Sequence, residues 1–155
     1  MSEFDHYLHG VLMRAAEEAR AEGSATVEAH HMLLALAAGG DPVLAAAGLD
    51  HAAVRGALDQ EFAHSLAAAG VTMPSGPPRS APAAGPPRSA PAAGTPSLGA
   101  TAKAALDRAI GRAPRKKDIR PGHVLLGILL AEVGTVPRAL ALAGADRHAL
   151  IERLP

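Results

Sequence analysis

The chain has 155 residues, with 15 Lys and Arg against 15 Asp and Glu, and it contains no Cys and no Trp. The absence of Cys excludes a disulfide framework, a thiol nucleophile and any metal site held by thiolates. Aromatic residues make up 2% of the chain, too few for a platform on which nucleic-acid bases stack. No apolar run approaches the roughly 20 residues that span a bilayer, and the first residues lack the basic start and apolar run of a signal peptide. We therefore expect a cytoplasmic protein without a membrane segment.

The zero net charge conceals two oppositely charged halves. Residues 1–74 carry a net charge of about −7 and residues 75–155 a net charge of about +7. Between them the nonapeptide GPPRSAPAA occurs twice in succession, at 76–84 and 85–93. This density of Pro removes amide donors and prevents regular helix, so we predict a disordered Pro/Ala/Gly-rich linker at 74–97 between units at 1–73 and 98–155. A proline-rich recognition motif around its two Arg residues is the alternative interpretation.

The first half has the apolar periodicity of four helices. The first is predicted at 4–22 with a stop at Gly23, and the second at 29–38. A short third helix is expected at 42–47, and a fourth begins behind Asp50 as its N-cap. The side chains expected to face the core from the fourth helix are Val54, Leu58 and Phe62.

The second half follows the same plan. Helices are predicted at 98–112, from Pro121 onward, at 137–143 and behind Asp146 as N-cap. The apolar face of the helix at 98–112 is predicted to contain Ala102, Ala105, Leu106, Ala109 and Ile110. Strands have little support anywhere, because β-branched and aromatic residues are scarce.

The two halves also match residue by residue. The sequence HMLLAL at 31–36 pairs with HVLLGI at 123–128, and AGLD at 47–50 pairs with AGAD at 143–146. We therefore predict an all-α fold of two tandem four-helix repeats. Each repeat is too small to bury its apolar faces alone, so we expect the two to pack against each other.

These residues carry a family resemblance. The segment FDHYLHGVLMRAAEEARAEGSATVEAHHMLLAL (4–36) is similar to the first repeat of the Clp N-terminal domain, also called the Clp repeat domain. The segment SLGATAKAALDRAIGRAPRKKDIRPGHVLLGIL (97–129) resembles the second repeat. The resemblance covers nearly all of the chain outside the linker, and the doubled His-x-Leu-Leu motif in register with the doubled Gly-x-Asp caps makes it specific.

The resemblance implies a binding function. In Clp unfoldases this domain precedes the ATPase modules and receives substrates or adaptor proteins. The chain has no GxxxxGK[ST] phosphate loop, so we expect a free-standing, non-enzymatic recognition module without an ATPase of its own. Its implied partners are a peptide or unfolded protein segment, Clp unfoldase or protease components or adaptors, or a cyclic peptide antibiotic. Such a module could modulate a Clp protease by competing for its substrates.

One family property is not expected here. Some members bind phosphoarginine through a Thr-Glu pair in each repeat, with the glutamate pairing the guanidinium. The matching positions are Ala29-His30 and Pro121-Gly122, so both carboxylates are missing. A bidentate arginine fork then has no partner at these positions.

The predicted ligand site is the groove between the repeats together with the exposed part of the first helix. The residues assigned to the ligand are Phe4, Tyr7, Val11, His30 and Gly122, with core packing as the alternative for the two aromatic rings. A structural role is assigned to the repeat motif residues His31, His123, Asp50 and Asp146. The two His are expected to bond the backbone through a ring nitrogen, and the two Asp to cap helices.

Metal and catalytic sites are not predicted. Among the eight His, the pairs His6/His9 and His30/His31 prompt a metal hypothesis, but a zinc site needs three or four converging ligands and no HExxH-type signature is present. No Ser lies in a GxSxG context. Glu17 and Glu18 are expected on the solvent side of the first helix. We therefore expect no catalytic residue, no metal and no cofactor.

A cluster of bases in the second half has three interpretations. Its members are Arg108, Arg112, Arg115, Lys116, Lys117 and Arg120. The favoured interpretation is that the positive charge of the cluster complements the acidic first repeat and ties the two halves together. The second is that the cluster is simply a solvated helix end and loop. The third, phosphate contacts, would make the protein a nucleic-acid-associated regulator. The long linker leaves both a monomer and a swapped dimer open.

Overall fold

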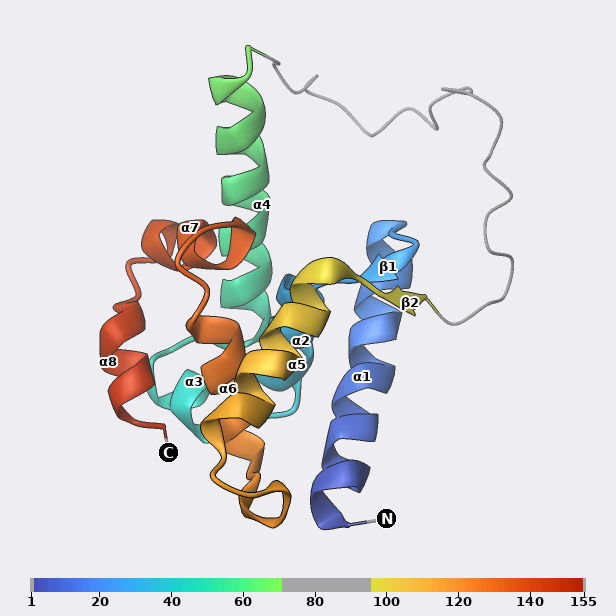
Figure 1. The fold of residues 1–155 in the computed structure, drawn as a ribbon. Coiled ribbons are helices and arrows are strands. Elements are labelled where there is room, and N and C mark those ends of the chain that lie inside the picture. Colours follow the sequence, from blue (N-terminus) through green and yellow to red (C-terminus); the bar gives the residue numbers. More distant parts are fainter. Residues whose placement is uncertain (1, 71–95, 155) are drawn as a thin grey trace.

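The computed structural model describes residues 2–70 and 96–154, and it is built from helices (Figure 1). The helices of the first half are α1 (Glu3–Glu22), α2 (Ala29–Ala38), α3 (Pro42–Ala46) and α4 (His51–Ala68). Those of the second half are α5 (Ala100–Arg112), α6 (Pro121–Leu129), α7 (Thr135–Leu142) and α8 (Arg147–Glu152). A 3₁₀ turn, η1 (Lys116–Asp118), lies between α5 and α6. The predicted all-α fold of two four-helix repeats is confirmed.

The repeat plan is visible in matching turns. The chain leaves α3 through Gly48 and α7 through Gly144, and both glycines have φ of 73°. This left-handed conformation strains residues that carry a Cβ, which explains a Gly at each position. Asp50 then caps α4 by accepting the Ala53 N–H at 2.8 Å, and Asp146 caps α8 by accepting the His148 N–H at 3.0 Å.

The two repeats share one apolar core. Its fully buried members come from both halves and are Met32, Leu33, Leu34, Leu44, Val124, Leu125, Ile128 and Leu129. Helix α2 contacts α5 and α6, and α4 lies along α7. Because each repeat contributes one part of the same buried cluster, the repeats complete each other as the sequence predicted.

Helices α5 and α6 approach so closely that one position must be Gly. A Cβ built on Gly127 would overlap the backbone oxygen of Ala105 and contact Ala109. In the first repeat the matching position on α2 is Ala35, which is 1% exposed. The second repeat therefore packs its first two helices more tightly than the first repeat does.

The structure corrects the expectation that strands are absent. Two short strands, β1 (Thr26–Val27) and β2 (Ser97–Leu98), pair in parallel and join the connection between α1 and α2 to the start of the second repeat. The N–H of Gly99 extends this pairing by donating to the Val27 oxygen at 2.8 Å. Period-2 apolar patterns cannot reveal strands of two residues, because the pairing comes from the approach of the repeats.

Two predicted core residues are exposed instead. Phe62 is 55% exposed because the second half of α4 extends beyond the body of the molecule (Figure 1). Ile110 is also 55% exposed, since α6 packs against the neighbouring face of α5 that carries Ala102, Ala105 and Ala109. The helix predicted at 137–143 begins earlier, at Thr135.

Residues 74–95 of the predicted linker at 74–97 lie outside the described residues. The last residue of the predicted linker, Ser97, belongs to β2. Among the helices of the described residues, none combines the length and the apolar character needed to cross a membrane.

Candidate functional site

A buried His opens the second helix of each repeat. The Nδ1 atom of His31 accepts the Glu28 N–H at 2.9 Å, and Nδ1 of His123 accepts the Arg120 N–H at 2.8 Å. Both rings are buried, at 0% and 6% exposure. A backbone N–H that would otherwise lack a helical partner is thereby satisfied in each repeat, which is the geometry of the structural role we assign to these residues.

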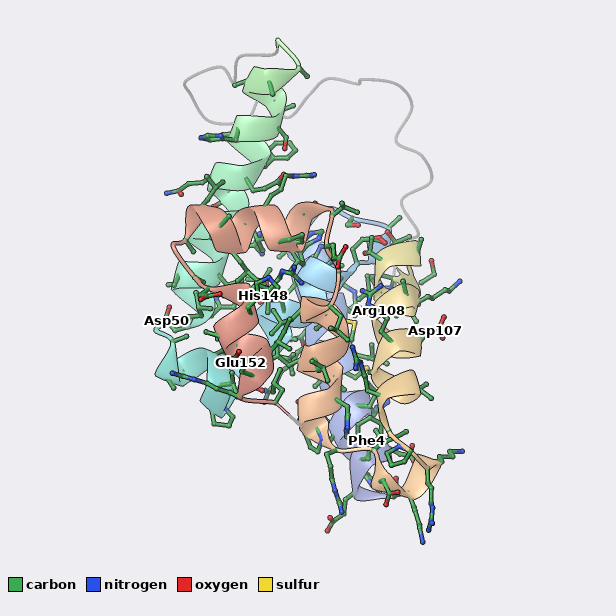
Figure 2. All side chains as sticks on the ribbon, turned by 60° about the vertical axis from the view of Figure 1, so that its left-hand side comes forward. Phe4, Asp50, Asp107, Arg108, His148 and Glu152 are labelled. Atoms are coloured by element: carbon green, nitrogen blue, oxygen red, sulfur yellow. The ribbon has the colours of Figure 1, made fainter. Side chains whose placement is uncertain are left out.

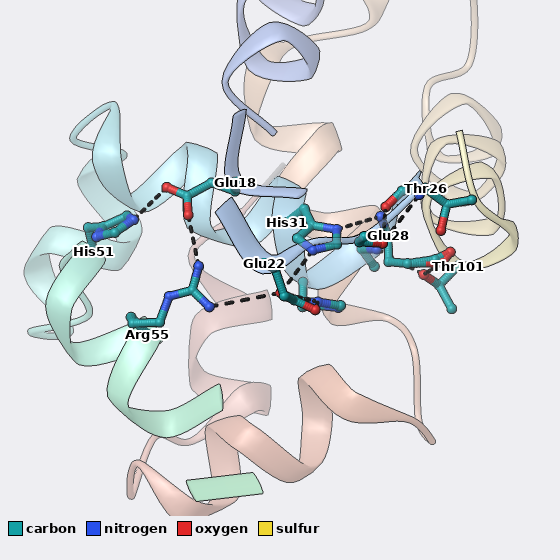
Figure 3. A network of polar contacts seen from close by, with 11 residues as sticks. Glu18, Glu22, Thr26, Glu28, His31, His51, Arg55 and Thr101 are labelled. Carbon is teal, nitrogen blue, oxygen red and sulfur yellow. Dashed lines mark hydrogen bonds and ion pairs between the residues drawn. The ribbon is translucent and has the colours of Figure 1, made fainter. Parts of the chain in front are cut away.

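In the first repeat this His also belongs to a polar network (Figure 3). Nε2 of His31 lies 2.9 Å from Oε2 of Glu22, and Nε2 of His30 lies 3.2 Å from the same oxygen. Burial lowers the pKa of His31 below 6.5, and the nearby His30 lowers it further against the opposing effect of Glu22. Burial alone would raise the pKa of Glu22, but the two His overcome this and lower it. The contact is thus a neutral His31 beside a charged carboxylate.

The network continues to α4 through Glu18. Its carboxylate bonds His51 at 2.6 Å and Arg55 at 2.9 Å, and the other Arg55 nitrogen lies 3.9 Å from Glu22. Glu18 was predicted to be simply solvated, but its side chain is only 18% exposed. The correction follows from the path of α4, which passes the end of α1 and brings the His51 ring and the Arg55 guanidinium against Glu18.

This network contains one arrangement that resembles a metal site. Glu22, His30 and His31 each offer a ligand atom within 4.8 Å of one another. His31, however, uses Nδ1 as an acceptor for the Glu28 N–H, so its neutral ring carries hydrogen on Nε2. A protonated Nε2 cannot ligate a metal, and the two remaining ligands are fewer than zinc uses. The cluster is therefore interpreted as a structural anchor.

A cavity lies between the two repeats. It encloses about 590 Å³ and is walled by the first turn of α2, one face of α5, and the connection from α6 to α7. Its lining residues are Glu28, Ala29, His30, Thr101, Ala104, Arg108 and residues 130–137. We call this cavity the inter-repeat cleft. Its size is in the range of ligand-binding cavities, and most of its walls are apolar.

Polar groups stand at fixed places in the inter-repeat cleft. The Thr101 hydroxyl accepts the Ala29 N–H at 2.9 Å, which ties α2 to α5. Glu28 packs so closely on the second repeat that a Cβ on Gly99 would overlap its carboxylate. Arg108, between α5 and α6 in Figure 2, donates from Nε to the Gly127 oxygen at 2.8 Å. Its two terminal nitrogens make no hydrogen bond within the described residues.

A second cavity of about 510 Å³ adjoins the inter-repeat cleft. His30 and Thr135 line both, so the His30 side chain forms part of the wall between them. The exposed ring of Phe62 lines this second cavity together with Arg55 and Leu58. Phe62, which the sequence pattern assigned to the core, therefore forms an apolar wall of this second cavity at the surface.

The predicted ligand residues do not all converge. Tyr7 and Val11 line a separate cavity of about 390 Å³ with Pro121, next to the predicted Gly122. Phe4 lies 6.3 Å from Tyr7 between ring centroids and packs against the core. Burial, followed by the charge of Asp41, raises the pKa of Tyr7 to about 12. Of the five predicted residues, only His30 lies in the inter-repeat cleft.

Sequence reasoning missed most of the inter-repeat cleft. Glu28, Thr101 and Arg108 come from segments far apart in the chain, and their spacing carries no motif. Val133, which is 85% exposed, lies in the connection between α6 and α7. Val133, as an apolar residue within a short loop, is the one feature of the sequence that could have indicated this rim of the inter-repeat cleft.

The family comparison agrees with this architecture. A model of the Clp repeat (R) N-terminal domain matches residues 3–111, which run from α1 through α5 and make up most of the chain. No curated protein matches the sequence.

Proposed function

This chain belongs to the family of Clp repeat N-terminal domains, and on that basis we propose that its inter-repeat cleft binds extended segments of other proteins. The domain is a substrate- and adaptor-binding module of Clp ATPases, and it is the one domain detected in the chain, a non-catalytic one. Binding of substrate or adaptor proteins is thus implied by membership. The location of binding and the form of the ligand are our proposal.

The observation that carries the proposal is a cleft with walls from both repeats. Its apolar surface, from Ala104 to Val133, favours the side chains of an unfolded segment, which are hidden in a folded protein. Arg108 has donors left for a peptide carbonyl, and the Glu28 carboxylate is an acceptor for a peptide N–H. Apolar walls with a donor and an acceptor suit a peptide backbone of any sequence better than one specific small molecule.

We extend the proposal to the consequence of such binding. A module that holds unfolded segments or adaptors competes with Clp unfoldases for them and so modulates a Clp protease. A cyclic peptide antibiotic presents the same chemistry, apolar side chains on a peptide backbone, and would be sequestered in the same cleft.

The test uses a ligand without charge, so that electrostatics elsewhere on the surface do not contribute. Fluorescence anisotropy would follow a labelled short peptide of Val, Leu, Ser and Asn. Val133→Ser, at the rim, and Ala104→Trp, which fills the cleft, should each weaken binding about fivefold, equal to roughly 1 kcal/mol. The matched control is Met13→Ser, which removes an apolar side chain that is 47% exposed on α1 and outside the cavity.

Two results would contradict the proposal. One is unchanged peptide affinity in both cleft variants, and the other is an equal loss in the Met13→Ser control. A cyclic, uncharged peptide of the same residues, used as competitor, checks the antibiotic extension: it should displace the linear peptide from the wild type and compete less well for Val133→Ser.

A further inference from the structure

The connection between α5 and α6 gathers exposed positive charge. Residues 112–120, which we call the basic loop, hold the exposed cations Arg112, Arg115, Lys116, Lys117 and Arg120 and a single acid, Asp118. Their net charge is +4 within nine residues. No ion pair involving these five cations occurs within the described residues, whereas the pairs that do occur use Arg55, Arg138 and three His.

The backbone of the basic loop is well anchored. Ile119 is 7% exposed, and the Arg120 N–H donates to the buried ring of His123. Within η1 the Asp118 N–H donates to the Arg115 oxygen at 2.9 Å. Pro114 and Pro121 restrict the backbone near both ends. The cations therefore project from a fixed support, which lowers the entropy lost when a partner binds.

The acidic first repeat does not neutralise this loop. Five of its ten acids serve their own repeat or the seam: Glu18 and Glu22 in the polar network, Asp41 and Asp50 as caps, and Glu61 against Arg138. Asp5 is the nearest case, because Lys116 makes a small contribution to its lowered pKa, but the main cause is hydrogen bonding from Ser2. No ion pair within the described residues therefore supports the favoured interpretation of the sequence, that this cluster ties the halves together. The ion pair across the seam comes from Arg138.

We infer that the basic loop is a docking surface for an acidic segment of a partner protein. Five cations on one short, anchored connection, without an ion pair to the part of the chain that the structure describes, are complementary to a run of Asp and Glu. The side chain of Ile110, 55% exposed in the last turn of α5, adds an apolar contact next to the loop. An acidic segment that carries an apolar residue fits both features.

A protein partner fits this surface better than a nucleic acid. The described residues of the loop and of the adjoining α5 include no aromatic side chain on which a base could stack. Five cations would neutralise at most five phosphates, and the loop forms no extended track along a strand. The exposed Ile110 has no counterpart on a phosphate backbone.

This surface is separate from the inter-repeat cleft. The cleft uses Ala104 and Arg108 of α5, whereas the basic loop lies beyond the other end of that helix, next to the start of α1 in Figure 1. At 1.5 Å per residue along α5, Arg112 lies roughly 12 Å from Ala104 and roughly 6 Å from Arg108. The inference therefore stands without the proposed peptide site.

The experiment compares three probes on the intact chain. Fluorescence anisotropy at low salt would measure binding of a labelled peptide of Glu and Leu, its Gln and Leu counterpart, and a single-stranded DNA of equal charge. The loop variant is R115Q/K116Q/K117Q. The control variant, R20Q/K103Q/R153Q, removes the same charge from exposed positions outside the loop.

We expect the acidic peptide to bind to the wild type. The loop variant should lose about tenfold in affinity for this peptide, or about 1.4 kcal/mol. The control variant should keep the wild-type affinity within about twofold, and binding should weaken as salt shortens the screening length from about 30 Å at 0.01 M to about 8 Å at 0.15 M. Binding of the Gln peptide with equal affinity overturns the proposal, as does an equal loss in both variants or tighter binding of the DNA. A wild type that does not bind the acidic peptide overturns it as well.

Discussion

The two repeats share a helical plan but use their charges differently. In the first repeat the acids Glu18 and Glu22 contact His51, Arg55 and His31, so part of its charge is paired within the repeat. In the second repeat the cations of the basic loop remain exposed and unpaired within the described residues. Although the net charge is zero, the described surface therefore has a region where positive side chains are exposed and make no ion pair. Composition alone does not reveal which charges a partner can reach.

Packing differs between the repeats as well, and this difference should give the largest effect. Gly127→Ala places a Cβ against the Ala105 oxygen, which forces α5 and α6 apart and should cost about 3 kcal/mol. The matched change in the first repeat, Ala35→Gly, should cost only about 1 kcal/mol, from helix propensity. Urea unfolding of both variants measures the contrast. Equal losses would show that the two helix pairs are packed alike.

The ion pair across the seam is expected to come next. Arg138 bonds Glu61 at 2.8 Å, and the Glu61 side chain is only 6% exposed, with Ser65 as its other donor at 2.6 Å. Arg138→Met leaves this carboxylate without its cation and should lower the free energy of unfolding by about 2 kcal/mol.

Its control is the double variant Glu61→Leu/Arg138→Met, which also removes the buried carboxylate. The double variant should be more stable than Arg138→Met alone, because an apolar pair replaces an unpaired charge. A double variant that is less stable than Arg138→Met would contradict this account of the seam.

The His31 network should make stability depend on pH. Because burial holds the pKa of His31 below its ordinary 6.5, the unfolded chain binds more protons than the folded chain just below that pH. The stabilising contribution is therefore complete above about pH 6.5 and is lost as pH falls toward the folded pKa, with a slope of at most about 1.4 kcal/mol per pH unit. The lowered pKa of Glu22 acts in the same direction, but below pH 4.5.

Thermal unfolding between pH 7 and 5 measures this slope. His31→Gln should be less stable at pH 7 and should flatten the pH dependence, since it removes the titrating ring but keeps a polar side chain. A variant with the wild-type slope would assign the pH dependence to another His.

The smallest effect is expected in the basic loop. Because its cations make no ion pair within the described residues, R115Q/K116Q/K117Q should change the free energy of unfolding by less than about 0.5 kcal/mol. Urea unfolding at low salt checks this. A larger destabilisation would mean that these charges support the fold, and the contrast between the repeats would lose its basis.

Particular residues show how far the sequence could be followed. Two helices were predicted correctly to start after Asp50 and Asp146, and a third to start at Pro121. These starts are predictable because N-caps and Pro act within one turn of the chain. Phe62 and Ile110 were assigned to the core wrongly, because periodicity identifies an apolar face but not whether another element covers it. The inter-repeat cleft could not be predicted, since Glu28, Thr101 and Arg108 meet only when the two repeats pack.

The sequence by itself determined the helices, their caps, the doubled motif and the division into two repeats of opposite charge. These follow from interactions between residues a few positions apart, which the order of amino acids specifies directly. The tertiary structure decided which charged side chains form ion pairs, which remain exposed, and where the inter-repeat cleft opens. Those outcomes depend on how one repeat docks on the other, and docking is set by shape and close approach, as at Gly127 and Ala105.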